Sequence, residues 1–300
     1  MVRLLDEDGI KRRKQRRLRR RQYFSKQDGL HQFLRYINYC FYVCNETQRE
    51  LKNLTTDNGS KFCLAFGFSR QLIWLEADVT NKRPEVVAEY FLNAVHTMKG
   101  CPQKIRADPG TENGIIATFQ TFLKTDPSAV SFGTSTANQR IERFWGILRL
   151  MKADFWMDHF KGLVYEELLE IGNPLHKSCI QFVYLPLIKR DLKGIMDQWN
   201  THSIRRQKLG DTLHGIPEVL FQNPEVVGAS NYLHPVQRNV VTELQRLVRN
   251  NFKEIDEDFA SVASSILSHY NLPFPVNITD MTCARHLYIF LSEFMSLLLT

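Results

Sequence analysis

Asp108 is the acidic residue whose neighbours most clearly predict an exposed position. It follows a short segment, Lys104 to Ala107, and precedes Pro109 and Gly110. This pattern predicts a short strand that ends in a tight turn. Since α/β sheets bind their ligands at the carboxyl ends of strands, we expect Asp108 to lie at a binding mouth. The alternative is that Asp108 only opens the turn, as Asp commonly does before Pro-Gly.

Glu142 is the second acidic residue that the pattern singles out. On a helix that begins near Asn138, Asn138 and Glu142 lie one turn apart on the same face, while the apolar positions point to the core. Glu142 is then able to face the same mouth as Asp108. The alternative is a surface glutamate that forms solvated ion pairs with Arg140 and Arg143, and such pairs add little stability.

Alternating strand-like and helical segments surround these two carboxylates. The predicted strands are Gln71 to Asp78, Lys104 to Ala107 and Ala129 to Phe132, and the predicted helices are Arg83 to Met98, Thr111 to Leu123 and Asn138 to Phe155. Strands that alternate with helices predict an α/β fold with the sheet between helices.

The segments before and after this α/β region are predicted to be helical. Leu30 to Val43 is expected to form a helix, and Pro174 to Trp199 two helical stretches interrupted at Pro186. Thr242 to Ser268 has the pattern of an amphipathic helix, and Cys283 to Leu299 that of a more apolar one. The C-terminal part is therefore predicted to be an all-α appendix that packs on the core or on another chain.

The positive charge of the chain is concentrated near its start. The net charge is +7, yet residues 27–300 hold 28 Lys and Arg against 29 Asp and Glu. Nine cations stand within eleven positions, a density typical of a nucleic-acid-binding or nuclear-import arm. These cations are Lys11, Arg12, Arg13, Lys14, Arg16, Arg17, Arg19, Arg20 and Arg21. The alternative is a merely solvated arm.

Several protein classes are disfavoured. The most apolar run, Leu287 to Leu299, is interrupted by Glu293, so no membrane span is expected, and the first residues show no signal-peptide core. Six cysteines are too sparse for a disulfide scaffold, which favours a reducing, intracellular compartment. Cys40 and Cys44 with His31 lack a second ligand pair, so no zinc site is predicted. No catalytic serine triad, Walker loop or dinucleotide fingerprint is present.

Six segments together resemble the integrase core domain family of animal genomes, whose members are related to retroviral integrases and transposases. They are GFSR from Gly67, IWLEA from Ile73, RADPGTEN from Arg106, STANQRIERFW from Ser135, WNTHSIR from Trp199 and GIPEVLF from Gly215. The resemblance spans about residues 66–236, and the basic arm is similar to the lead-in of that family. The last sixty residues are not explained by it.

The resemblance implies a ribonuclease H-like mixed sheet flanked by helices, in which three carboxylates hold two divalent metals, Mg²⁺ or Mn²⁺. Carboxylates are the hard ligands that such metals accept. Asp108 matches the family's second Asp and Glu142 its Glu. Asn138 and Gln139, with Arg140 beside them, match polar positions that orient the Glu or contact the DNA backbone.

The first carboxylate departs from the family pattern. The family carries it in a Trp-His-x-Asp-Gly stretch, and no Trp-His pair precedes Gly67 here. Asp57 is the nearest substitute, since it precedes Lys61 much as the family Asp precedes a Lys. Asp78 is a second substitute, although its place after WLEA is wrong for the first strand. Residues 27–64 as a whole do not resemble the family.

The sequence therefore leaves three functions open. The chain is an integrase or transposase that joins DNA by two-metal phosphoryl transfer, a catalytically dead nucleic-acid-binding remnant of one, or an inert fold whose terminal helices bind a partner. DNA is the expected partner, the nucleus the expected compartment, and homo-oligomers follow from the resemblance only. The predicted parts are a basic arm (1–26), an aberrant segment (27–61), the integrase-like core (62–236) and a helical C-terminal region (237–300).

Overall fold

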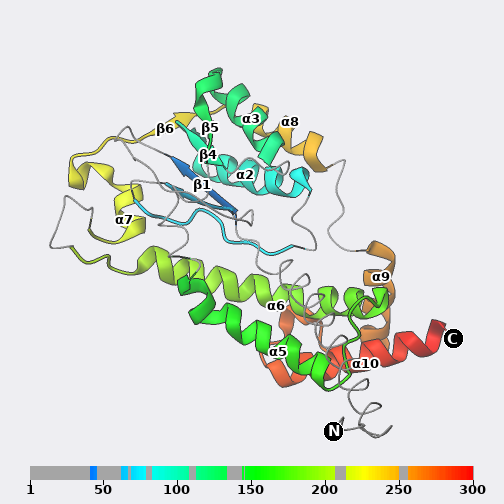
Figure 1. Cartoon of the computed structure of the whole chain (residues 1–300). Helices are drawn as coiled ribbons and strands as arrows, with labels where there is room; N and C mark the ends of the chain where they lie inside the picture. Colours follow the sequence, from blue (N-terminus) through cyan, green and yellow to red (C-terminus); the bar gives the residue numbers. More distant parts are fainter. Residues whose placement is uncertain are drawn as a thin grey trace, which may run out of the picture.

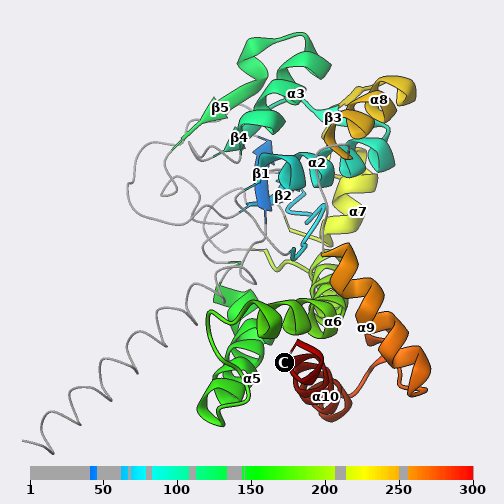
Figure 2. The same ribbon diagram turned by 90° about the vertical axis from the view of Figure 1, so that its right-hand side faces the viewer.

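The computed structural model describes residues 41–45, 62–66, 69–78, 83–107, 113–133, 144, 146–206, 214–249 and 256–299. Two groups of elements are visible within these ranges (Figures 1 and 2). One group is a small sheet with α2 (Pro84–Met98), α3 (Gly114–Lys124) and α8 (Arg238–Arg249) beside it. The other is formed by the helices α5 (Asp154–Tyr165), α6 (Pro174–Thr201), α9 (Glu257–His269) and α10 (Met281–Leu299).

The sheet has four short strands in the spatial order β2-β1-β4-β5. β1 (Phe41–Asn45) pairs in parallel with β2 (Phe62–Phe66) and antiparallel with β4 (Ile105–Ala107). β4 pairs in parallel with β5 (Val130–Phe132). The sheet is therefore mixed, and β4 and β5 are joined by a crossover through α3, the connection that parallel neighbours require.

Local sequence features define where α2 (Pro84–Met98) and α3 (Gly114–Lys124) begin and end. Pro84 occupies the first position of α2, where a missing N–H is harmless, and both helices end on a residue in the left-handed conformation, Lys99 and Thr125. The Gln120 side chain, fully buried, donates a hydrogen bond to the Pro102 carbonyl over 2.6 Å. α3 is thereby fastened to β3.

A second, two-stranded sheet ties the C-terminal half of the chain to the first half. β3 (Gly100–Pro102) pairs antiparallel with β6 (Leu233–Pro235), and α8 (Arg238–Arg249) follows directly. α8 runs antiparallel along α2, with Val241 and Val248 buried. α7 (Pro217–Gln222) and the 3₁₀ helices Pro127–Ala129, Pro224–Val227 and Pro275–Asn277 complete the connections.

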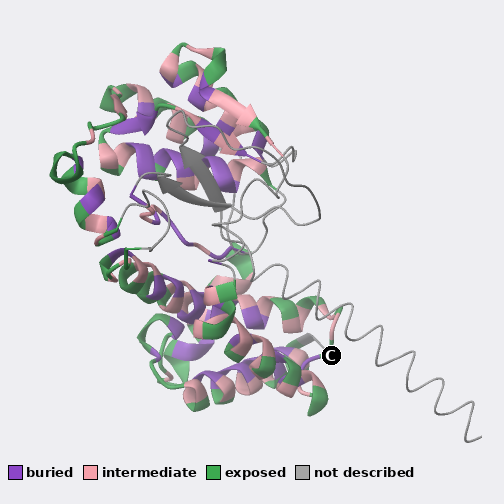
Figure 3. Ribbon diagram, turned by 60° about the vertical axis from the view of Figure 1, so that its left-hand side comes forward, coloured by how far each residue is buried: buried purple, intermediate pink, exposed green. Residues whose placement is uncertain are grey.

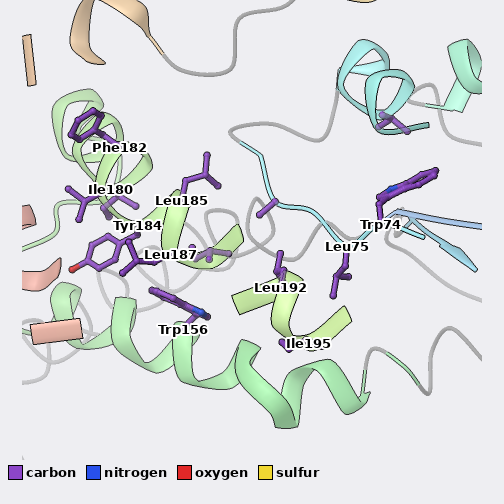
Figure 4. Packing of buried hydrophobic residues seen from close by; sticks show 14 of the residues in the cluster. Trp74, Leu75, Trp156, Ile180, Phe182, Tyr184, Leu185, Leu187, Leu192 and Ile195 are labelled. Atoms are coloured by element: carbon purple, nitrogen blue, oxygen red, sulfur yellow. The ribbon is translucent and has the colours of Figure 1, made fainter. Parts of the chain in front are cut away.

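The helical group is built around α6 (Pro174–Thr201), a single helix of 28 residues. α5 (Asp154–Tyr165), α9 (Glu257–His269) and α10 (Met281–Leu299) surround it, and α10 packs along it. Figure 4 shows Trp156 of α5 facing the buried residues of α6, Tyr184 and Leu187 among them. The buried apolar residues of this group and of the sheet region form one continuous cluster, coloured purple in Figure 3.

A π-helical turn, Arg149–Ala153, keeps the apolar face of the helix before it in register with that of α5. Leu148 and Trp156 are both buried, but eight residues separate them, one more than two α-helical turns contain. A π turn absorbs one extra residue. None of its own residues is buried, and Leu150 is 85% exposed, so the extra residue bulges toward solvent.

The predicted elements around Asp108 are confirmed: the helix before it, strand β4, α3 and strand β5 all lie where expected, although α3 begins at Gly114. The predicted helix from Asn138 is observed where the structure describes it, from Phe144 on.

Four predictions were wrong. Phe41–Val43 belongs to a strand, because consecutive aromatic and β-branched residues favour extended backbone. Gln71 to Asp78 is not a strand: Leu72 forms a single bridge, and its N–H and carbonyl are bound by the Asn200 side chain of α6. α6 continues through Pro186, because the buried neighbours Leu185 and Leu187 offset the lost hydrogen bond. Thr242 to Ser268 forms two helices, α8 and α9.

Candidate active site

The carboxyl end of β4 is the part of the predicted site that the structure describes best. Ala107 is the last residue of β4, lies opposite Phe132 of β5, and is buried. Its carbonyl accepts a hydrogen bond from the Gly133 N–H over 3.1 Å, so the two strands end together. Asp108 is the next residue in the chain. The described backbone thus delivers the chain to residue 108 at the end where α/β sheets bind ligands.

A cation lies beside this strand end. The guanidinium of Arg106 covers Gly133 so closely that a Cβ on that residue would lie 2.5 Å from its Nη2. Gly133 therefore has to lack a side chain for Arg106 to keep this position. In the strand, Ile105 and Ala107 are buried while Arg106 is half-buried, so Arg106 extends to the face opposite the core.

The predicted site residues themselves fall outside the described residues. This holds for the carboxylates Asp57, Asp108 and Glu142, for Asn138, Gln139 and Arg140, and for the nine cations from Lys11 to Arg21. The structure describes their neighbours in the chain, Ala107 and Phe144. Within the described ranges, no three His, Cys, Asp or Glu side chains are grouped so that they could hold a metal ion.

Phe144, two residues after Glu142, is packed into the core. It is 2% exposed, and its ring meets that of Trp199 edge to face, with centroids 4.9 Å apart. Trp199 in turn donates a hydrogen bond from Nε1 to the Arg70 carbonyl over 2.9 Å. The C-terminal end of α6 thus joins the segment after Glu142 to the segment after β2.

Asn200, the next residue of α6, binds the same segment. Its Oδ1 accepts from the Leu72 N–H and its Nδ2 donates to the Leu72 carbonyl, each over 2.8 Å. Asn200 therefore satisfies the backbone N–H and carbonyl of the buried residue Leu72, as a neighbouring strand would. We call Trp199 and Asn200 together the α6 clamp.

The sequence analysis did not predict the α6 clamp. Trp199 and Asn200 stand in the WNTHSIR segment. An amide side chain followed by further polar residues at the end of a long apolar helix was the available signal, since a buried Asn needs partners on both its oxygen and its nitrogen.

The other residues considered from the sequence have structural partners. Nδ1 of His202 is hydrogen-bonded to the Trp199 carbonyl, consistent with a structural His. Asp78, 8% exposed, accepts a hydrogen bond from the Tyr90 hydroxyl over 2.7 Å. Two residues after His202, the backbone of Ile204 forms two hydrogen bonds with that of Gly215. The next residues, Arg205 and Arg206, are exposed.

Two of the described cysteines are poor nucleophiles and poor metal ligands. Cys101 and Cys179 are buried free thiols. Burial raises the pKa of Cys101 to about 11, against a smaller opposing effect of Lys124, and burial raises that of Cys179 to about 12. Since the thiolate is the reactive and metal-binding form, both side chains act as small apolar core residues.

Comparison with protein-family models identifies the family of this chain. Residues 62–223 match the family model described as "Integrase core domain", which covers more than half of the chain. The chain belongs to the integrase core domain family. The match contains β2, β4, α3, β5 and α6, the elements that border the candidate site. The prediction of the family from the sequence is confirmed.

An integrase core domain implies a ribonuclease H-like fold and an integrase- or transposase-like function that involves DNA and divalent metal. In this integrase core domain protein, the described helices include none with the length and apolar character of a membrane span. Searches of curated proteins and of solved structures gave no match.

Proposed function

We propose that this chain binds DNA and joins DNA ends by metal-dependent phosphoryl transfer, with Asp108, Glu142 and Asp57 as the carboxylates that hold the metal. The observation that carries the proposal is the parallel pairing of β4 with β5. Both strands end at the same edge, where Ala107 accepts from Gly133, and Asp108 follows at once. This supports a ligand site at that edge.

The donor chemistry fits a divalent cation. Aspartate and glutamate oxygens are the hard ligands that Mg²⁺ and Mn²⁺ prefer, and three of them leave room for a phosphate oxygen. When bound, such ions activate the attacking hydroxyl and stabilise the leaving oxygen. Asp108 would hold its carboxylate at the end of β4, and Glu142 would add its own from the predicted helix that continues through Phe144.

DNA binding is proposed for three groups of cations and amides. The arm from Lys11 to Arg21 would neutralise phosphates and release counterions, and the same basic segment would direct the chain to the nucleus. Asn138, Gln139 and Arg140 would contact the backbone of the DNA near the carboxylates. Arg205 and Arg206, exposed after the Ile204 bridge, would be two further cations that contact phosphates.

A strand-joining assay with a labelled DNA end and Mn²⁺ tests the proposal. Glu142→Gln keeps the size of the side chain but removes the charge, and should lower joining by about 10³-fold, equivalent to about 4 kcal/mol of transition-state stabilisation. Glu225→Gln, an exposed glutamate on the 3₁₀ helix after α7, is the matched control and should retain full activity. Full activity of Glu142→Gln would refute the carboxylate assignment.

DNA binding without catalysis is the second candidate, and one observation favours it. The strand between β2 and β4 is β1, whose sequence FYVCN contains no carboxylate. The family resemblance expects the first carboxylate on a strand in this part of the sheet. If the chain only binds, DNA affinity survives Asp108→Asn, wild type shows no joining, and deletion of residues 11–21 lowers affinity and flattens its salt dependence.

A further inference from the structure

We infer that Trp199 is a positioning residue that holds the segment carrying Glu142 against the segment that follows β2. The inference rests on the proposed function and adds a residue to it. Trp199 lies at the C-terminal end of α6 and contacts Phe144 through its ring and Arg70 through its Nε1. These two contacts reach parts of the chain that are far apart in sequence.

The contact with Phe144 sets the orientation of its segment. The backbone at Phe144 is helical, and the ring is buried in edge-to-face contact with Trp199, an arrangement with a preferred geometry. On the helix predicted over residues 138–155, positions two apart project to opposite sides. Fixing Phe144 toward the core would therefore direct residue 142 away from it.

The contact with Arg70 fastens Trp199 to the other side. Arg70 has φ of 60°, a left-handed conformation that is uncommon for a residue with a side chain. Its carbonyl accepts from Trp199 Nε1, and two residues later the amide of Asn200 binds both backbone groups of Leu72. Three hydrogen bonds from adjacent residues thus hold residues 70–72 in one position.

The Trp199–Phe144 contact of the α6 clamp differs from another aromatic contact of α6 in the segments that it joins. Phe182 and Phe259 also meet edge to face, with centroids 6.1 Å apart, but they join α6 to α9 and touch no segment next to a predicted carboxylate. Phe182 is 9% exposed, so a Leu there removes a similar interaction from a similar environment. Phe182→Leu is therefore the matched control for Phe144→Leu.

The test compares full-length wild type, Trp199→Phe, Phe144→Leu and Phe182→Leu. Trp199→Phe keeps a ring against Phe144 but removes the bond to the Arg70 carbonyl, and Phe144→Leu does the reverse. Hydrogen exchange is measured in peptides that cover residues 69–72 and 144–148, and strand joining is measured as kcat and KM for DNA. Unfolding midpoints show that each variant folds.

A positioning role predicts faster exchange of residues 69–72 in Trp199→Phe and of residues 144–148 in Phe144→Leu. It also predicts a kcat lower by about tenfold with a DNA KM within about twofold, because displacement of a reacting group affects the transition state more than binding. Phe182→Leu should change neither exchange in these peptides nor kcat.

Equal kcat in Phe144→Leu and Phe182→Leu, or unchanged exchange in both peptides, would overturn the inference. Absence of metal-dependent joining by wild type is a separate result that refutes the proposed function. In that case the exchange data alone decide whether Trp199 fixes the two segments.

Discussion

The end of β4 and the helical group around α6 are built in opposite ways. β4 and β5 have three residues each, and their common end is held by one backbone bond and a guanidinium that covers Gly133. α6 has 28 residues and packs through buried side chains against α5, α9 and α10. The difference teaches that the proposed site at the β4 end would depend on positions fixed elsewhere, since each strand there has only three residues.

The α6 clamp connects the two regions. It lies at the last turn of α6 and binds both the chain after β2 and Phe144. On this account, substitutions in the helical group outside the α6 clamp change stability and leave the activity per folded molecule unchanged, whereas substitutions at the β4 end change activity and leave stability nearly unchanged.

The largest stability effect is expected in the helical group. Leu291 of α10 is fully buried, so Leu291→Ala should lower the free energy of unfolding by about 3 kcal/mol through lost contacts and a cavity. Urea titration measures this loss. A loss below about 1 kcal/mol would show that α10 is not part of the core.

Two glycine substitutions sharpen the comparison. Gly162 lies inside α5 with nothing within 4 Å of an added Cβ, so Gly162→Ala should raise the free energy of unfolding by about 1 kcal/mol. Gly133→Ala should displace Arg106 from the β4 end, at a cost of roughly 1 kcal/mol or less because a guanidinium is able to move. Thermal unfolding and strand joining should show that only Gly133→Ala lowers joining. Equal joining by both variants would contradict a role of the Arg106 position.

Two tyrosines of the helical group form a matched pair. The hydroxyl of Tyr184 is buried and has no hydrogen-bond partner among the described residues, whereas that of Tyr288 donates to the Leu168 carbonyl over 2.9 Å. Tyr184→Phe should therefore be neutral or stabilising, by up to about 1 kcal/mol, and Tyr288→Phe should destabilise by about 1 kcal/mol. Equal losses in chemical denaturation would mean that Tyr184 has a partner in solution.

His159 gives the helical group a pH dependence. Burial, and then the positive charge of Arg285, lower the pKa of His159 below its ordinary value of 6.5, against an opposing effect of Glu166. The folded state then binds fewer protons than the unfolded state at acidic pH. The free energy of unfolding is therefore unaffected by His159 above about pH 6.5 and decreases as the pH drops through the lowered pKa. Denaturation at about pH 7.5 and 5.5 should show a smaller decrease in His159→Gln than in wild type. An identical decrease would assign the effect to other groups.

The sequence predicted the surroundings of Asp108 well because local signals define them. Pro84 starts α2, and short apolar runs between turn residues mark β4 and β5. Local signals could not predict that α6 passes through Pro186 or that residues 71–78 do not form a strand. Both depend on contacts with distant residues, Leu72 with Asn200 above all. The first carboxylate could not be assigned with the same assurance as Asp108 and Glu142, because residues 27–64 lack the family pattern that would identify it.

Calorimetric titration of the full chain with Mn²⁺ tests the central claim most directly. Wild type, Asp108→Asn and Asp57→Asn are compared, with Glu225→Gln as the exposed control. The account predicts that wild type and the control bind Mn²⁺ and that each Asn variant loses this binding, since removal of one carboxylate of three disrupts the charge and geometry of the site. Wild-type binding that is unaffected by both Asp108→Asn and Asp57→Asn would contradict the account.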